Sequence, residues 1–176
     1  MQKERYNAQT KTRFMLSMDL SGVLGDSEAV RNMKMNCYGV ETPQVTAGVT
    51  YTAFNGYKVP IPNGNRDEEK IFSIKFVVSE SMVEYAAMLK WINAVTVQVS
   101  EDQEVVEDYR VTADLWVLDS YLKPLPVPIT YEGMFIGKLG SLDFDQSDQS
   151  GDVLKCSADF YYYRSFLDYD RILGLK

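Results

Sequence analysis

Alternating apolar and polar residues predict β-strands in both halves of the chain. Within segment 13–20, Phe14, Leu16, Met18 and Leu20 recur at every second position, with mostly polar residues between them. A period of two places these side chains on one face of a strand whose other face meets water. The same pattern predicts further strands over 32–38, 70–79 and 153–162, and we also expect strands over 110–118 and 129–136.

One segment, 82–94, carries a helical period instead. Ser81, followed three residues later by Glu84, forms a capping-box pattern typical of a helix N-terminus. Apolar residues then recur at the i, i+3, i+4 and i+7 positions, which predicts a buried stripe flanked by Trp91. That stripe comprises Tyr85, Met88, Leu89 and Ile92. Alternation over 95–99 predicts the start of another strand.

Between residues 40 and 69 the regular pattern fails, although the segment is rich in apolar side chains. Loops of this length in compact domains are usually functional, and the apolar content argues against disorder. The sequence Asn63-Gly64-Asn65-Arg66-Asp67 predicts a turn. We expect an extended arm that packs either on the chain's own sheet or on a neighbouring copy. Its candidate interface residues are Pro43, Val45, Val49, Tyr51, Phe54, Tyr57, Val59 and Ile61.

The C-terminal segment 163–176 is also too apolar to be left in water without a partner. Tyr163, Phe166 and Tyr169 are its candidate interface residues. Three consecutive tyrosines at 161–163 are also compatible with base stacking, but the local charge does not form a basic groove. Interface aromatics are therefore the favoured interpretation.

Length and composition indicate one mainly β domain. The chain has 176 residues, of which 45% are hydrophobic, and no internal repeat or linker divides it. Strands before and after a single helix predict an antiparallel sandwich or barrel with one helix packed on it. Residues 1–12 are polar and form an expected N-terminal extension without a secretion signal. No apolar run approaches the ~20 residues that span a bilayer, so we expect no membrane binding.

Charge limits the class of partner. Lys and Arg number 18 and Asp and Glu 25, a net charge of −7. Residues 99–176 hold 7 basic and 15 acidic side chains, a net charge of −8, so they carry the whole of the imbalance. Such a surface repels nucleic acid and anionic lipid instead of holding them.

The sequence offers few residues suited to catalysis or metal binding. The chain has no histidine, which excludes Ser-His and Cys-His catalysis and imidazole metal sites. Cys37 and Cys156 fall on inward strand faces and are expected to be core residues. The acidic segments 101–108 and 143–152 are typical of solvated loops, and the second lacks the glycine and glutamate of a calcium loop. We therefore expect no enzyme activity, metal or cofactor.

Several segments, taken in order, resemble the tail tube protein of contractile-tailed phages, whose relatives form the inner tubes of type VI secretion and extracellular injection machines. The resemblance covers about residues 13–163. It rests on Arg13-Phe-Met-Leu-Ser-Met-Asp-Leu, Met33-Lys-Met-Asn-Cys-Tyr, Val59-Pro-Ile-Pro, Gly64-Asn-Arg-Asp, Phe72-Ser-Ile-Lys-Phe-Val-Val, Leu89-Lys-Trp91 in the helix, and Asp159-Phe-Tyr-Tyr-Tyr. Segment 164–176 departs from the pattern.

The resemblance implies a structural protomer of the inner tail tube. In that family six β-sandwich protomers form a ring whose sheets join into a continuous channel-lining barrel. Rings stack through a long arm, which corresponds here to 40–69. Sheath would lie outside, baseplate and tail-terminator proteins at the ends, and DNA would pass through the lumen without sequence-specific binding. The protein would be made in the host cytoplasm and reside in the virion.

Some alternatives stay open on the sequence. The departure at 164–176 is compatible with a tube initiator or baseplate-proximal ring protein. A small-molecule-binding β-barrel is the alternative from another class. Outward strand positions that could line a channel are Asp19, Asp114, Glu132 and Asp159, but also Lys34, Lys75 and Lys155. The sequence does not choose between these faces.

Overall fold

The computed structural model describes residues 13–20, 23, 37–96, 109–144 and 152–174. The predicted segments 1–12, 32–36, 97–108 and 145–151, together with Lys34, lie outside this part of the chain. In order, the elements are β1 (Phe14–Met18), β2 (Cys37–Glu41), β3 (Val45–Phe54), β4 (Tyr57–Glu68), β5 (Ile71–Val77), α3 (Val83–Thr96), β6 (Val111–Val117), β7 (Ile129–Leu139), β8 (Lys155–Tyr161), β9 (Arg164–Leu167) and α4 (Tyr169–Leu173).

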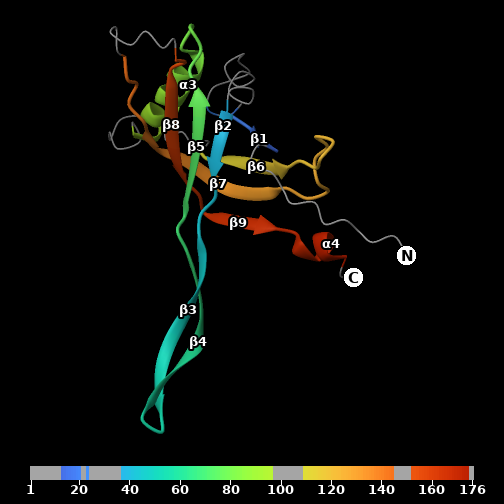
Figure 1. Ribbon diagram of the computed structural model, residues 1–176. Coiled ribbons are helices and arrows are strands. Elements are labelled where there is room, and N and C mark those ends of the chain that lie inside the picture. The colour runs from blue at the N-terminus through green and yellow to red at the C-terminus, as the bar shows by residue number, and fades with distance from the viewer. Residues whose placement is uncertain (1–12, 21–22, 24–36, 97–108, 145–151, 175–176) are drawn as a thin grey trace, which may run out of the picture.

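The molecule consists of a body and an arm that projects from it (Figure 1). Seven strands form the body sheet in the order β1-β6-β7-β8-β5-β2, with β9 paired to β7, and all of the pairings are antiparallel. The arm is the separate two-stranded sheet β3-β4. The predicted mainly β antiparallel fold with one main helix is therefore confirmed. Among the described strands the sheet does not close into a barrel.

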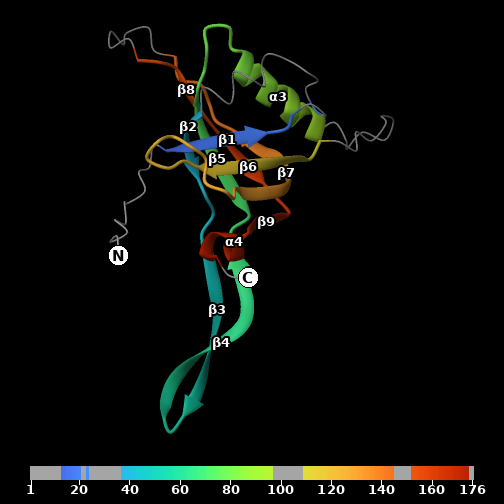
Figure 2. The ribbon, with the colours of Figure 1, turned by 90° about the vertical axis from the view of Figure 1, so that its right-hand side faces the viewer.

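Strand β7 belongs to two layers that pack as a sandwich. The crossing layer contains β1, β6, the first part of β7, and β9, whereas the arm layer contains the second part of β7, β8, β5 and β2. Gly133 in β7 has φ +63° and lies within the register shift against β6, and a second shift against β8 follows at Ile136–Lys138, so the strand bends from one layer into the other. Strands of the arm layer run along the direction of the arm, while those of the crossing layer lie across it (Figures 1 and 2).

The core lies between these layers and α3. Phe72, Trp91 and Phe160 are fully buried, and the rings of Trp91 and Phe160 lie 5.4 Å apart between centroids. The inward positions that alternation predicts in β1, β5 and β8 are buried, because period two directs alternate side chains to one face. They include Leu16, Met18, Phe72, Ile74, Phe76, Cys156, Ala158 and Phe160.

The buried face of helix α3 overlaps the predicted stripe in part: Met88 is fully buried, and Tyr85 and Ile92 are partly buried against the core. Its buried residues are Glu84, Ala87, Met88 and Trp91, and Leu89 is 43% exposed. Glu84 is tolerated inside because its carboxylate accepts hydrogen bonds from the backbone N–H of Ser79 (3.1 Å) and from the Ser79 hydroxyl (2.6 Å). Its partners lie outside the helix, so apolar periodicity could not detect them.

The tryptophan is central to that face and does not flank it. The indole N–H of Trp91 donates to the Tyr109 carbonyl at 2.8 Å, which satisfies the polar end of the ring inside the core. The helix continues through Thr96, so the prediction of a strand beginning at Val95 was wrong at its start. Residues 97–99 lie outside the described chain.

Candidate functional site

The arm is a regular β-hairpin and not the irregular excursion that the sequence predicted. Asn55 and Gly56 have φ values of +47° and +83° and join Phe54 to Tyr57 as a two-residue turn. Such turns favour Asn-Gly because both central residues need positive φ. Asn55-Gly56 was the signal that could have found the hairpin, but the proline content of the segment masked it.

The turn predicted at 63–67 lies inside strand β4, so that prediction was wrong. The segment makes a bulge, where the pairing shifts from Val49–Pro62 to Ala47–Arg66. The Asn63 side chain accepts a hydrogen bond from the backbone N–H of Asn65 at 3.0 Å, and Gly64 has φ +78°. The local turn chemistry is real, but the chain continues as a strand on either side of it.

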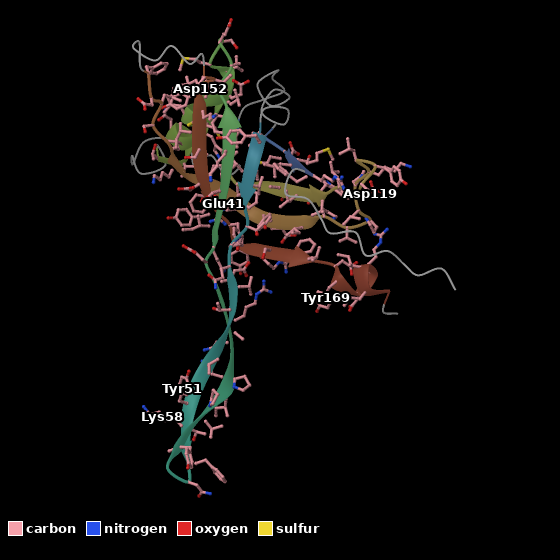
Figure 3. All side chains as sticks on the ribbon, in the orientation of Figure 1. Glu41, Tyr51, Lys58, Asp119, Asp152 and Tyr169 are labelled. Atoms are coloured by element: carbon pink, nitrogen blue, oxygen red, sulfur yellow. The ribbon has the colours of Figure 1, made fainter. Side chains whose placement is uncertain are left out.

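The two faces of the arm follow from its register. Val49, Tyr51 and Ala53 pair with Pro62, Pro60 and Lys58, and we call this side the Tyr51 face. Figure 3 shows Tyr51 and Lys58 on the same side of the arm. The opposite side, the Ile61 face, carries Thr50, Thr52, Phe54, Tyr57, Val59 and Ile61.

Both faces are exposed. Tyr51, Phe54 and Tyr57 show 65%, 66% and 76% of their surface, and the four aliphatic candidates Val45, Val49, Val59 and Ile61 show between 38% and 51%. Of the predicted arm residues, only Pro43, at the root, is half-buried. The arm of a single chain therefore leaves its apolar side chains in water, contrary to the alternative that they pack on the chain's own sheet.

Prolines block one edge of the arm. Phe54 and Tyr57 close the turn as a hydrogen-bonded pair, so Pro60 and Pro62 occupy non-hydrogen-bonded positions. At such positions a backbone N–H would point away from β3, and proline has none. The β4 edge therefore lacks two donors that an added strand would need, which is how natural sheets discourage edge-to-edge pairing.

Glu68 joins the root of the arm to the body. Its carboxylate accepts hydrogen bonds from the Tyr162 hydroxyl (2.7 Å) and the Ser165 hydroxyl (2.5 Å), and it lies 3.1 Å from the Arg66 guanidinium. Burial raises the pKa of Glu68, but these hydrogen bonds and the nearby positive charges outweigh it and leave the pKa lowered. Burial beside this carboxylate raises the pKa of Tyr131 to about 12.

A groove of about 360 Å³ lies at the same root. It brings together candidate residues that are far apart in the sequence: Pro43 and Val45 of the arm, and Phe166 and Tyr169 of the C-terminal segment. Ile129 and Leu167 add apolar surface, and Arg66 and Glu68 add charge. The sequence predicts these residues as two separate interfaces and contains no signal that places them in one groove.

Comparison of the fold with solved structures finds several neighbours. A chain of an extracellular contractile injection system, the PVC sheath-tube complex in the extended state, matches with a TM-score of 0.60 and 15% identity over 93% of each chain. A chain of the anti-feeding prophage cap, the AFP tube terminating cap, matches with a TM-score of 0.63 and 15% identity over 96% of this chain and 95% of that one.

A third match is a chain of the PVC sheath/tube terminator, with a TM-score of 0.62 and 15% identity over 94% of this chain and 99% of that one. The protein has the tube fold of contractile injection systems. The resemblance to tail tube proteins is thereby confirmed at the level of the fold. No family model and no curated protein matches the sequence.

In this tube-fold protein the C-terminal segment is attached to the crossing layer. Strand β9 pairs with β7, and the short helix α4 follows, its N-cap Asp168 accepting a hydrogen bond from the Arg171 N–H at 3.1 Å. Tyr163 and Tyr169 are 72% and 63% exposed. The Lys70 ammonium lies 5.5 Å from the centre of the Tyr163 ring.

The four acidic candidates for a channel lining divide between two faces. Asp19, Asp114 and Glu132 lie at outward positions of the crossing layer, whereas Asp159 lies on the outer face of the arm layer. The Thr130 hydroxyl donates to Asp114 and the Ser73 hydroxyl to Asp159, both at 2.6 Å, and Arg164 pairs with Glu132 at 2.8 Å.

The arm layer also carries the basic candidates. Two of these candidates, Lys75 and Lys155, line a shallow pocket of about 430 Å³ on its outer face together with Lys138, which the sequence did not single out. The Lys75 ammonium pairs with Glu41 at 2.6 Å. The outer faces of the two layers therefore differ in charge, which strand patterns alone did not reveal.

The described residues offer few groups suited to catalysis or metal binding. Burial raises the pKa of the Cys37 thiol to about 11 and also raises that of Cys156, the opposite of what a thiolate nucleophile needs. No group of three or more potential metal-ligating side chains is found in the part of the chain that the structure describes. None of the described helices has the length and apolar character to cross a membrane.

Proposed function

We propose that this chain is the protomer of the inner tube of a contractile phage tail or a related injection machine. Six copies close a ring, and rings stack through the arm in residues 40–69. A repeated head-to-tail contact of this kind generates an open filament. The observation that carries the proposal is the hairpin arm, which leaves its apolar side chains exposed in the single chain.

The proposal assigns the chain a structural and not a catalytic role. Sheath surrounds the tube, and baseplate and terminator proteins close its ends. DNA passes through the lumen on its way into the host, without sequence-specific binding. The protein is made in the host cytoplasm and becomes part of the virion. Support comes from neighbours in sheath-tube, terminator and baseplate assemblies of injection systems, which share this fold.

The arm layer is the part of the body that we assign to the channel. Barrel strands run along the barrel with a moderate tilt, and the strands of this layer run with the arm (Figure 1). Its outer face would line the lumen with Asp159 and the three lysines around the shallow pocket. Asp19, Asp114 and Glu132, on the other layer, would then face away from the channel.

A second candidate is a ring protein at one end of the tube. It is favoured by the exposed C-terminal segment β9–α4 and by the terminator and baseplate assemblies among the structural neighbours. Copy number in purified particles separates the two roles. A tube protein is present in many rings, and an end protein in one or two.

Negative-stain electron microscopy of the purified chain, concentrated and then diluted, tests the proposal. We expect stacked sixfold rings or tubes at high concentration, which shorten or dissociate on dilution. A monodisperse monomer at every concentration would contradict it. Stabilisation of that monomer by a small ligand would favour the binding-barrel alternative.

A further inference from the structure

We infer that, in the assembled tube, the arm lies between two other copies of this chain, with one copy against each of its faces. This inference rests on the proposed function and adds the geometry of the contact. It starts from the distribution of side chains over the two faces of the hairpin. An arm that lay on the surface of the tube would have one face on protein and one in water.

A sheet that meets water on one side normally alternates between apolar and polar positions. This arm does not. The Tyr51 face presents Val49, Tyr51, Ala53 and two prolines with one charged residue, Lys58, and the Ile61 face presents Phe54, Tyr57, Val59 and Ile61 with two threonines, Thr50 and Thr52. Lys58 is the single charged residue between positions 45 and 65. Both faces therefore have the composition of covered surfaces.

The β4 edge of the arm offers fewer interactions to a neighbouring chain than the two faces do. Pro60 and Pro62 remove two donors from the β4 edge, so an added strand cannot complete its hydrogen bonds there. A two-stranded hairpin is also at best marginally stable alone in water. Packing against the faces supplies what the β4 edge cannot, because the exposed side chains point there.

The available area is on the scale of a specific interface. An aromatic side chain buries ~150–250 Å² on full burial, and the three rings of the arm expose about two thirds of their surface. They would contribute about 400 Å² in total, roughly half of the ~800 Å² that each partner brings to a standard interface. The aliphatic side chains of both faces add to this.

The groove at the arm root is one surface on a neighbouring copy that suits such a contact. It is apolar along Pro43, Val45 and Phe166, and it holds about 360 Å³. It belongs to every copy, so each arm in a stack would find an equivalent groove. Two neighbours of the same kind are therefore sufficient, and no second protein is required.

Photo-crosslinking counts the neighbours of one arm. Tyr51→Cys and Ile61→Cys place a thiol on opposite faces, and each is labelled with a benzophenone maleimide. The native thiols react slowly because burial raises the pKa of both. A trace of the doubly labelled chain is assembled with excess unlabelled wild type, pelleted to confirm incorporation, and irradiated.

We expect the doubly labelled chain to give a three-chain product, while each singly labelled control gives only a two-chain product. Incorporation with two-chain products alone from the double label would overturn the inference and leave the tube function standing. A wild-type chain that never assembles would instead overturn the proposed function, and the inference with it.

Charged substitutions give a second measurement that needs no label. Tyr51→Glu and Ile61→Glu each place a carboxylate on one face of an exposed ribbon, so the unfolding of the monomer should stay unchanged. We expect each of them alone to reduce the yield of pelletable tubes at least tenfold. Wild-type yield from either variant would show that its face is in water and would overturn the inference.

Discussion

In the body, Phe72, Trp91 and Phe160 are fully buried, whereas Tyr51 and Tyr57 of the arm expose 65% and 76% of their surface. The body therefore gains its stability within one chain, because its apolar surface is already removed from water. The arm has a well-formed turn and register but no core of its own. Its apolar side chains stay exposed in the single chain, so they add little burial to the stability of the folded monomer.

The largest expected effect separates the two regions directly. Phe160→Ala removes a fully buried ring that contacts Trp91, and it should lower the free energy of unfolding by ~3–5 kcal/mol. Tyr57→Ala changes an exposed ring and should stay within ~0.5 kcal/mol of wild type. Urea denaturation of the monomer measures both values.

Tube assembly should show the opposite pattern to stability, with the arm variant affected although its folding is not. Tyr57→Ala should fold normally and lose tubes, because aromatic anchors often contribute ~2 kcal/mol or more to an interface. Tyr121→Ala is the matched control, since Tyr121 is 82% exposed but lies between β6 and β7 in the body. Equal tube yields from the two variants would remove the distinction between arm and body.

A smaller effect is expected where the arm meets the body. The pKa of Glu68 is lower when folded than its ordinary value of 4.5, so its contribution to stability is complete above pH 4.5. That contribution is lost as the pH falls through the lower, folded-state pKa. Glu68→Gln should therefore destabilise the protein by ~1–3 kcal/mol at pH 7 and by much less near pH 2.

Urea titrations of wild type and Glu68→Gln across this range measure the difference. Glu69→Gln serves as the control because Glu69 is an exposed neighbour in the same sequence. A difference between wild type and Glu68→Gln that does not change with pH would contradict a role for the ionised carboxylate at the arm root.

The smallest expected effect distinguishes the two outer faces of the body within a tube. Ser157 lies on the arm layer and Thr112 on the crossing layer, and both residues are exposed, so Ser157→Cys and Thr112→Cys place one thiol on each outer face. If the arm layer lines the channel, a large polymer-linked maleimide should label Ser157→Cys several-fold more slowly in tubes than in monomers, while a small maleimide labels it readily. The reverse pattern, with Thr112→Cys protected, would assign the channel to the crossing layer.

The local sequence was sufficient to predict most strands of the body. Period two identified β1, β5 and β8 because alternate side chains of a strand must point to opposite faces, and strands were also predicted where β6 and β7 lie. It also placed Cys156 and Phe160 in the core. The helix was found for the same kind of reason, and Met88 is buried as predicted. The burial of Glu84 and Trp91 was missed, since their polar groups are satisfied by Ser79 and by Tyr109, outside the helix.

The arm shows more clearly which features the sequence alone does not predict. Asn55-Gly56 determines the turn locally, and the sequence also shows that residues 45 to 57 carry no charge. The sequence alone did not show that the segment pairs with itself, that Pro60 and Pro62 face its outer edge, or that Pro43 and Phe166 share a groove. Those facts depend on register and on contacts between distant segments, which the folded chain sets cooperatively and no local pattern encodes.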